Sequence, residues 1–414
     1  MTIDQLKKVN RDLDGKIHQL DTLFESAKEF SGILDEERLI KLFSLTLMGH
    51  IGTNRYALCL KNGKNITSKI SSEHLDEYKN ILFELISEPV LLTEELLNSV
   101  FLKVRPCLTA EKIRAVIPLQ IQNEVQGVLC VGERLREGDY SQEELEFLYS
   151  LASFAILSLE NARLFKEAIE KQRLENELLI AREIQQNLLP RHIPEIKNFE
   201  IAAVNVSSKQ VGGDYYDIIP LHNSQFVLAI GDVAGKGTPA SLLMANAQAT
   251  LRTLVPFQLS LPETTARIND IIFENTTPDK FITFFLGLLN SETKEFSYVN
   301  AGHNPPFVLR ANGSIERLTE GGIILGIMKA MIPYKEGKII LEQGDSVILF
   351  TDGVSEAMNS NGEEYTEEKL EEIIRGFRHY SAGKILSSIT HEITSYTIGA
   401  PQSDDITLMV FTAL

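Results

Sequence analysis

The chain has 414 residues, which predicts two or three domains, and 43% of its residues are hydrophobic, enough for each domain to bury a core. The formal net charge of −17 argues against a general nucleic-acid-binding protein, because nucleic-acid phosphates repel an acidic surface. No apolar run is long enough to span a membrane and no signal-peptide pattern opens the chain, so we expect a cytoplasmic protein in which Cys59, Cys107 and Cys130 are reduced core thiols.

The first 140 residues show helical and strand patterns in turn. Leu20, Phe24 and Phe30 belong to an apolar set at helical spacing, which predicts helices within residues 5–45. Two β-branched stretches on either side of a polar turn at residues 122–124 predict a hairpin. The elements expected here are a strand at Tyr56–Leu60 with the turn Asn62-Gly63 after it, a helix at Leu75–Ile86, and hairpin strands at Arg114–Leu119 and Val125–Val131.

A single long helix is expected next. Ser141 is followed three residues later by Glu144, which is the spacing of a capping box at a helix N-terminus. No Gly or Pro occurs from there to Leu189, and Pro190 then ends the run.

This helix carries an imperfect apolar seam, partly at heptad spacing, that predicts a short parallel coiled coil and therefore a homodimer. The alternative is a single solvated connector helix. The seam contains Leu157, Leu164, Leu174, Leu178, Ala181 and Leu188, and it is interrupted by Glu160, Glu167, Lys171 and Gln185.

After about residue 190, strand patterns with Gly-rich turns replace the long helical runs and indicate an α+β fold in layers. The predicted strands are Phe226–Ile230, Phe281–Leu289, Phe296–Val299, Phe307–Leu309, Val347–Phe350 and Ile406–Phe411. The predicted helices are Thr238–Leu254, Pro262–Asn275, Glu367–Arg375 and Ala382–Thr397.

Acidic motifs in this part of the chain suggest a metal site. They are Gly212–Asp217, Gly231–Gly237, Thr351–Gly353 and Asp404–Thr407, and three of them lie at predicted strand ends. Carboxylates gathered at one point repel each other, so they need a cation to persist together. Hard oxygen ligands favour Mg²⁺ or Mn²⁺, and the lack of His or Cys at ligand spacing disfavours zinc. The alternative for each Asp-Gly pair is an ordinary turn.

The loop around Lys236 has some likeness to a phosphate-binding P-loop, but the pattern fails. The P-loop needs GxxxxGK followed by Ser or Thr, whereas Gly231 stands one residue too close and Lys236 is followed by Gly237. We expect a tight turn, with Thr238 or Pro239 opening a helix and Lys236 either structural or attracting phosphate.

In this order, the motifs resemble those of the bacterial SpoIIE-type serine phosphatases, a branch of the metal-dependent PPM (protein phosphatase 2C-like) family. The resemblance covers about residues 175–414. It begins with Ala181-Arg-Glu-Ile-Gln-Gln-Asn-Leu-Leu-Pro190 and continues through Val211–Asp217, Gly231–Gly237, Asn300–Pro306, Thr351–Ala357 and Asp404–Thr407.

The resemblance implies a central β-sandwich flanked by helices, with two Mg²⁺ or Mn²⁺ ions at one end that activate water for attack on phosphoserine or phosphothreonine. It implies that Asp214 binds one metal and that Asp232 bridges both, with the Val233 carbonyl as a further ligand. Asp352 and Asp404 would bind the other metal. Asp405 could substitute for its neighbour, and Asp217 is placed outside the ligand set.

The sequence departs from the eukaryotic phosphatases of this superfamily at one position. They carry a His, proposed as a general acid, two residues after the bridging Asp, and this chain has Ala234 there. His303 is a candidate replacement, but we favour a structural turn histidine beside Asn304-Pro305.

Residues 20–165 resemble a GAF sensor domain, chiefly in Val116–Gly132 and in the helix that ends Leu159–Phe165; the related PAS fold is the alternative. Its ligand cannot be read from the residues. The three cysteines could contact a ligand or respond to oxidation, although buried structural thiols are the better interpretation.

We therefore expect an N-terminal helix at 1–19, a GAF-like α/β sensor domain at 20–160, a coiled-coil linker at 161–190 and a PPM/SpoIIE-type phosphatase domain at 191–414. By resemblance, the substrate is a serine- or threonine-phosphorylated protein of the anti-anti-sigma (STAS) type. The alternative is a pseudophosphatase that grips a partner without catalysis.

Overall fold

The computed structural model describes residues 3–61, 66–121, 124–277 and 279–414. The chain divides into two compact units, Met1–Arg173 and Leu174–Leu414, which are described separately below. The turns expected at Asn62-Gly63 and at residues 122–123 lie outside the described residues. No helix in the described part of the chain is both long and apolar enough to cross a membrane.

The N-terminal unit is built on a five-stranded antiparallel sheet in the order β2-β1-β5-β4-β3. Its strands are β1 (Tyr56–Leu60), β2 (Ile66–Ser68), β3 (Val90–Leu91), β4 (Ile113–Ile121) and β5 (Glu124–Gly132). The expected hairpin is therefore confirmed as β4 and β5, which pair from Ile113↔Gly132 to Ile121↔Glu124.

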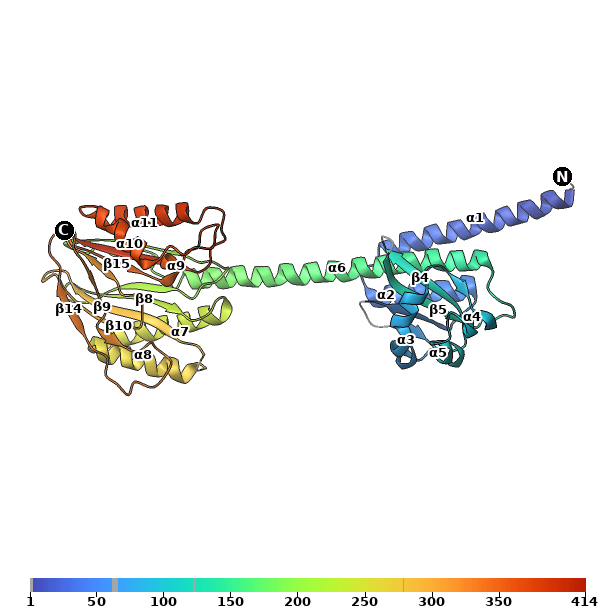
Figure 1. The fold of residues 1–414 in the computed structure, drawn as a ribbon, viewed down its shortest axis with the longest axis horizontal. Coiled ribbons are helices and arrows are strands. Elements are labelled where there is room, and N and C mark those ends of the chain that lie inside the picture. The colour runs from blue at the N-terminus through green and yellow to red at the C-terminus, as the bar shows by residue number, and fades with distance from the viewer. Residues whose placement is uncertain (1–2, 62–65, 122–123, 278) are drawn as a thin grey trace. The chain divides into compact units, whose positions relative to one another are not determined.

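Helices cover both faces of this sheet (Figure 1). One core holds side chains of α1 (Ile3–Ser31), α2 (Glu36–Thr46), the short helix η1 (Leu47–Ile51) and α6 (Gln142–Gln186). The other core holds side chains of α3 (Ser72–Leu85) and α5 (Arg105–Ala110), with α4 (Glu94–Asn98) at its margin. Cys59, Cys107 and Cys130 are all buried in the second core, as expected of structural thiols.

Helix α1 extends beyond its expected bounds, whereas helix α6 confirms the single long helix expected from Ser141 to Leu189. Helix α1 is continuous through residue 19, where the N-terminal helix was expected to give way to the sensor domain. Helix α6 is continuous for 45 residues, and its capping box is present, with reciprocal hydrogen bonds between Ser141 and Glu144. The unit boundary falls within α6, after Arg173.

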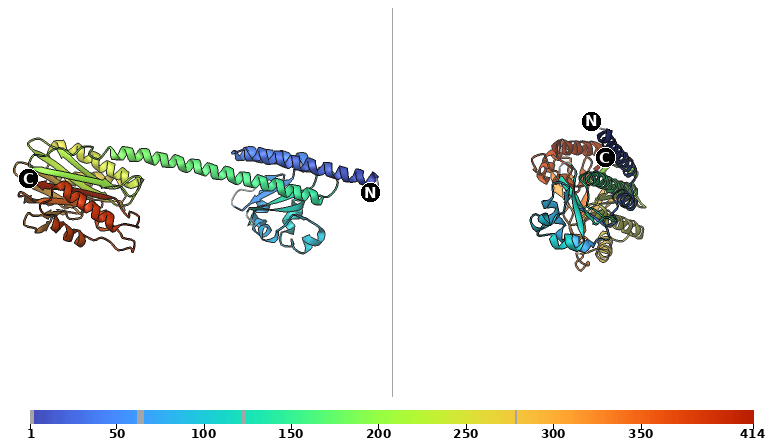
Figure 2. Two further views of the ribbon diagram at one scale, coloured as in Figure 1. Left: turned by 90° about the horizontal axis from the view of Figure 1, so that it is seen from above. Right: turned by 90° about the vertical axis from the view of Figure 1, so that its right-hand side faces the viewer.

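The C-terminal unit is a sandwich of two β-sheets with helices outside each (Figures 1 and 2). The first sheet has the order β13-β10-β9-β8-β7, with β14 beside β10, and the second has the order β12-β11-β15-β16-β6. Inward side chains such as Ile230, Phe285, Leu349 and Phe411 form the core between the sheets. The predicted α+β class and the helix-flanked β-sandwich are therefore confirmed.

The strands of the first sheet are β7 (Tyr215–Pro220), β8 (Gln225–Val233), β9 (Ile282–Asn290), β10 (Glu295–Ala301), β13 (Gly321–Gly322) and β14 (Gly337–Ile340). Those of the second are β6 (Phe199–Val206), β11 (Phe307–Leu309), β12 (Ile315–Arg317), β15 (Ser346–Phe350) and β16 (Ile406–Ala413). Helices α7 (Thr238–Leu254) and α8 (Leu261–Asn275) pack on the first sheet, and α10 (Glu367–Ile374) and α11 (Ala382–Tyr396) pack on the second. The six predicted strands and four predicted helices of this part are confirmed to within a few residues.

Candidate functional site

The carboxylates expected to bind metal come from both sheets of the sandwich. Asp214 directly precedes β7, and Asp232 is the last residue but one of β8, where Tyr215 pairs with Gly231. Asp352 opens the short helix α9 (Asp352–Ser355) just after β15, and Asp404 lies two residues before β16. Because β15 and β16 pair antiparallel, these last two positions meet at the end of the sandwich that also carries the first two.

Asp214 joins the two sheets directly. Its Oδ2 accepts hydrogen bonds from Thr351 Oγ1 at 2.8 Å and from Thr407 Oγ1 at 2.6 Å, and both threonines belong to the second sheet's end. Its Oδ1 is buried and has no hydrogen-bond partner among the described residues. A buried carboxylate oxygen without a partner is costly, so a cation bound at this oxygen would relieve the cost.

Burial and mutual repulsion act on the acidic side chains here. Burial first, and then the charge of Asp232, raise the pKa of Asp214 well above its usual range. Burial and then the charge of Asp352 raise the pKa of Asp232 to about 7. Burial and then Asp404 raise the pKa of Asp352. These shifts are those of carboxylates gathered without a compensating charge.

The carboxylate oxygens of the acidic group have the chemistry that a hard divalent cation prefers, but the side chains are not arranged as a closed set of metal ligands. Carboxylate oxygens suit Mg²⁺ or Mn²⁺, and the unpartnered Oδ1 of Asp214 is a vacant donor atom. Within the described ranges, however, no three His, Cys, Asp or Glu side chains lie close enough together to form a metal site.

Lys236 makes a structural contact at this site. Its Nζ lies 2.8 Å from Asp404 Oδ2 and donates to the Ser403 carbonyl at 2.6 Å. The turn that carries it uses two glycines at positive φ, Gly235 at 102° and Gly237 at 80°, a region that favours glycine. Lys236 thus links the loop after β8 to the loop before β16, and α7 begins at Thr238 as predicted.

Asp405 is already committed to hydrogen bonds with the protein. Its Oδ1 accepts from the Ser208 N–H at 2.7 Å, and its Oδ2 accepts from the Gly213 N–H at 2.7 Å. The Asp405 backbone also packs against Gly353. A Cβ at position 353 would collide with the Asp405 carbonyl oxygen, so only glycine fits there. Asp405 therefore anchors the loop that carries Asp214.

Gln185, at the end of α6, is a site residue whose role the sequence did not reveal. Its side-chain Nε2 donates to the Gly212 carbonyl at 2.6 Å, and its Oε1 accepts from the Gly212 N–H at 3.0 Å. The side chain is buried, and the bonded glycine lies two residues before Asp214. A second link comes from Gln248 of α7, which donates to the Leu188 carbonyl at 3.2 Å. The sequence signals were its place in the motif Ala181–Pro190 and its position as a polar residue in an apolar seam, and neither signal named a partner.

Asp217 is fully buried but does not join the acidic group. Arg252 of α7 binds it through both nitrogens, Nε to Oδ2 at 2.8 Å and Nη2 to Oδ1 at 3.0 Å. The Tyr215 hydroxyl donates to the same Oδ2 at 2.7 Å. The motif Asp214-Tyr-Tyr-Asp217 therefore holds two carboxylates with different surroundings, and only the first faces the other acids.

His303 lies in a buried turn near the same end of the sandwich. Burial lowers the pKa of its imidazole to about 4, so the ring is neutral at neutral pH. Its Nδ1 lies 3.0 Å from Thr283 Oγ1, and Asn300 Oδ1 accepts from its backbone N–H at 2.7 Å. These contacts favour the structural interpretation of this histidine over a proton donor.

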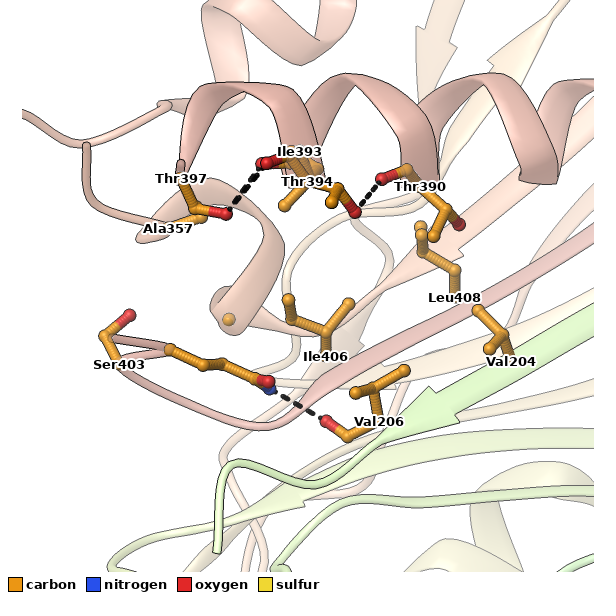
Figure 3. A pocket seen from close by; sticks show the side chains of 12 residues that line it. Val204, Val206, Ala357, Thr390, Ile393, Thr394, Thr397, Ser403, Ile406 and Leu408 are labelled. Atoms are coloured by element: carbon orange, nitrogen blue, oxygen red, sulfur yellow. Dashed lines mark hydrogen bonds between the residues drawn. The ribbon is translucent and has the colours of Figure 1, made fainter. Parts of the chain in front are cut away.

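A pocket of 210 Å³ lies beside the acidic group, between β6, β16, α11 and α9 (Figure 3). Its walls are mainly apolar and include Val204, Ile393, Ile406 and Leu408, with the Gln402 side chain bonded to the Val206 carbonyl. None of the four acids is among its lining residues, so the acidic group itself lies outside this pocket.

The first prediction concerns Gln185. Gln185→Ala removes both partners of a buried backbone N–H and C=O, so it should destabilise the C-terminal unit by about 1–3 kcal/mol. Hydrogen exchange of the full chain should then become faster in the segment 207–214. The matched control is Gln186→Ala, the same side chain one residue later and exposed. Equal exchange in the two variants would show that the contact does not hold this loop.

Comparisons with known proteins give matches in the C-terminal unit. Residues 222–413 match the family model of Stage II sporulation protein E (SpoIIE). The chain is 33% identical over 193 residues to phosphoserine phosphatase RsbU of Bacillus subtilis, covering 46% of this chain and 57% of that protein. It is 28% identical over 272 residues to protein IcfG of Synechocystis, covering 59% of this chain and 42% of that one. The matches thus span about half the length of these relatives.

Among solved structures, the SiaA-PP2C domain of Pseudomonas aeruginosa superposes with a TM-score of 0.52 at 18% identity, covering 59% of this chain and 99% of that domain. That similarity concerns the fold. From residue 222 to residue 413, the chain is therefore similar to the SpoIIE-type domains that its motifs predicted, on a fold of the PP2C type.

Proposed function

We propose that the C-terminal unit is a metal-dependent protein serine/threonine phosphatase. The observation that carries this proposal is the meeting of Asp214 and Asp232 from one sheet with Asp352 and Asp404 from the other, with one oxygen of Asp214 left without a partner. The similarity over 193 residues to a phosphoserine phosphatase supports the same activity.

In this proposal, Asp214, Asp232 and the Val233 carbonyl would hold one cation, and Asp352 and Asp404, with Asp232, would hold a second. The two ions, Mg²⁺ or Mn²⁺, supply activation of water and neutralisation of phosphoryl oxygens. Thr351 and Thr407 orient Asp214 by bonding one of its oxygens, and its other oxygen would then be available to a cation.

Asp405 and His303 have roles other than binding a cation. Asp405 is retained as the anchor of the Asp214 loop, because both of its carboxylate oxygens already accept backbone N–H bonds. His303 stays neutral, so it does not protonate the leaving group at neutral pH, and Ala234 has no group that could.

The proposal extends to the substrate of the phosphatase and to the regulation of its activity by the N-terminal unit. Resemblance to the SpoIIE-type phosphatases supports a phosphorylated STAS-type regulatory protein as substrate, in the cytoplasm. The five-stranded sheet with helices on both faces supports a GAF-like sensor in the N-terminal unit, with an unknown ligand. Pairing of α6 in a homodimer would then carry the signal.

A pseudophosphatase that only grips its partner is the second candidate. The repulsion among Asp214, Asp232 and Asp352 disfavours it, because a protein without catalysis has no need to keep such acids together. The full chain with Mn²⁺ and a generic aryl phosphate discriminates the two, since only the enzyme releases phosphate.

The second prediction concerns the metal. Hydrolysis by the full chain should require Mn²⁺ or Mg²⁺ and stop when a chelator is added. The same ions should raise the melting temperature, because they bind only the folded arrangement of carboxylates. Activity that persists in excess chelator would rule out the two-metal proposal, whereas a thermal shift without hydrolysis would point to the pseudophosphatase.

The third prediction compares Asp232, which belongs to the acidic group, with Asp217, which is fully buried outside that group. Asp232→Asn should abolish activity and the thermal shift with Mn²⁺, while the metal-free protein keeps its stability because a repelled charge is gone. Asp217→Asn should keep the Mn²⁺ shift but lower stability by about 1–3 kcal/mol, because Arg252 and Tyr215 lose a charged acceptor for their hydrogen bonds. If both variants lost the Mn²⁺ response equally, the ligand assignment would be wrong.

The fourth prediction concerns α6. Four residues inserted near Glu170 would rotate the following helix by about 40°, whereas seven nearly preserve its phase. Since Gln185 binds the Asp214 loop, the four-residue insertion should change basal phosphatase activity strongly and the seven-residue insertion much less. Unchanged activity and signal response in both would mean that α6 is only a tether.

A further inference from the structure

Helix α1 presents an apolar face that its own unit does not cover. Ser26 and Phe30, on another side of the helix, are buried against the core of the N-terminal unit. The uncovered face runs for nearly the whole helix, and each of its apolar residues is more than half exposed. They are Leu6, Val9, Leu13, Ile17, Leu20 and Phe24.

The spacing on this face is that of a two-stranded coiled coil. Leu6, Leu13 and Leu20 recur every seven residues, and Asn10, Ile17 and Phe24 recur every seven residues four positions later. This assigns the leucines to heptad position d and the second set to position a. Leucine at d with a β-branched residue at a, here Ile17 alone, favours two parallel strands. One polar Asn at an a position fixes register and a two-stranded state at some cost in stability.

The flanking charges agree with a parallel pair. In this register Lys16 occupies a g position and Asp21 an e position, five residues apart, and both side chains are exposed. In a parallel dimer, a g residue lies near the e residue five positions later in the other chain. Lys16 would therefore lie near Asp21 of the partner subunit. A surface pair of this kind adds little stability but favours this orientation.

Helix α6 carries a similar stripe within the same unit. Phe154, Leu157 and Leu164 are exposed, and Asn161 stands seven residues after Phe154, again in the a position. Helices α1 and α6 run in the same direction and contribute side chains to the same core (Figures 1 and 2). One two-fold axis along these helices would therefore allow both to pair in parallel with their copies.

We propose that α1 forms a parallel, in-register, two-stranded coiled coil with α1 of a second copy of this chain. The interface is separate from the linker pairing of α6 and from the acidic site, and it does not rest on the phosphatase activity. A second copy of α1 satisfies every feature of this face. In register, each heptad leucine and Asn10 would face the same residue of the other copy, and Lys16 would lie near its Asp21.

The test is disulfide trapping in the full chain. Leu6→Cys and Leu20→Cys each place a thiol at a d position, and the native cysteines are buried. The control is Glu25→Cys, which is exposed on α1 but lies at position b, away from the interface. After mild oxidation, each d variant should form a covalent dimer about 100-fold faster than the control, because pairing brings the thiols to an effective concentration in the millimolar range.

Two variants far apart on the helix also test direction. A parallel pair cross-links Leu6→Cys with itself and Leu20→Cys with itself. An antiparallel pair centred between them cross-links only a mixture of the two variants, which would overturn the proposed orientation. Cross-linking of both variants no faster than the Glu25→Cys control would overturn the interface itself.

Discussion

Asp214 and Asp232 come together at one end of a β-sandwich, where burial and mutual repulsion raise the pKa of both carboxyls. Two further acids, Asp352 and Asp404, approach from the opposite sheet and add to the repulsion. Folding without a cation therefore works against electrostatics at this point, and the rest of the sandwich must hold the acids in place. A divalent cation would attract each carboxylate and offset their mutual repulsion, so its binding would stabilise the folded site.

The supports of Asp214 come from distant parts of the chain. Two threonines of the second sheet bind one of its oxygens, and Asp405 binds the N–H of the preceding residue, Gly213. Gln185 binds both backbone groups of Gly212, so the last turn of α6 is part of the same network. A change in the position of that turn would act on Asp214 through two peptide units, without any contact between the helix and a cation.

The N-terminal unit has surface features that fit the proposed pairing with a second copy. Its cores are complete, yet α1 and the first half of α6 keep apolar stripes in water with an Asn in each. Burying such stripes against a second copy removes apolar area from water, whereas each Asn limits which partner and register are acceptable. Symmetric pairing at α1 would align two α6 helices as well, and each α6 ends on the Gln185 contact.

The sequence by itself predicted the four main helices and six of the strands of the C-terminal unit, and it named the acidic residues as candidates. Helix α7 and strand β11 have the predicted bounds, because their periodicity and end signals lie within the segment itself. The four acids could be named because motif spacing is also local. Strand β7 was missed, since its buried Asp217 makes the segment resemble a polar loop until Arg252, 35 residues later, pairs with it. Only the tertiary structure decided that Asp405 anchors a loop, that Lys236 binds Asp404 and that Gln185 binds Gly212. Each of these roles depends on a partner that is distant in the sequence. That partner comes within reach only when the sheets and helices pack together.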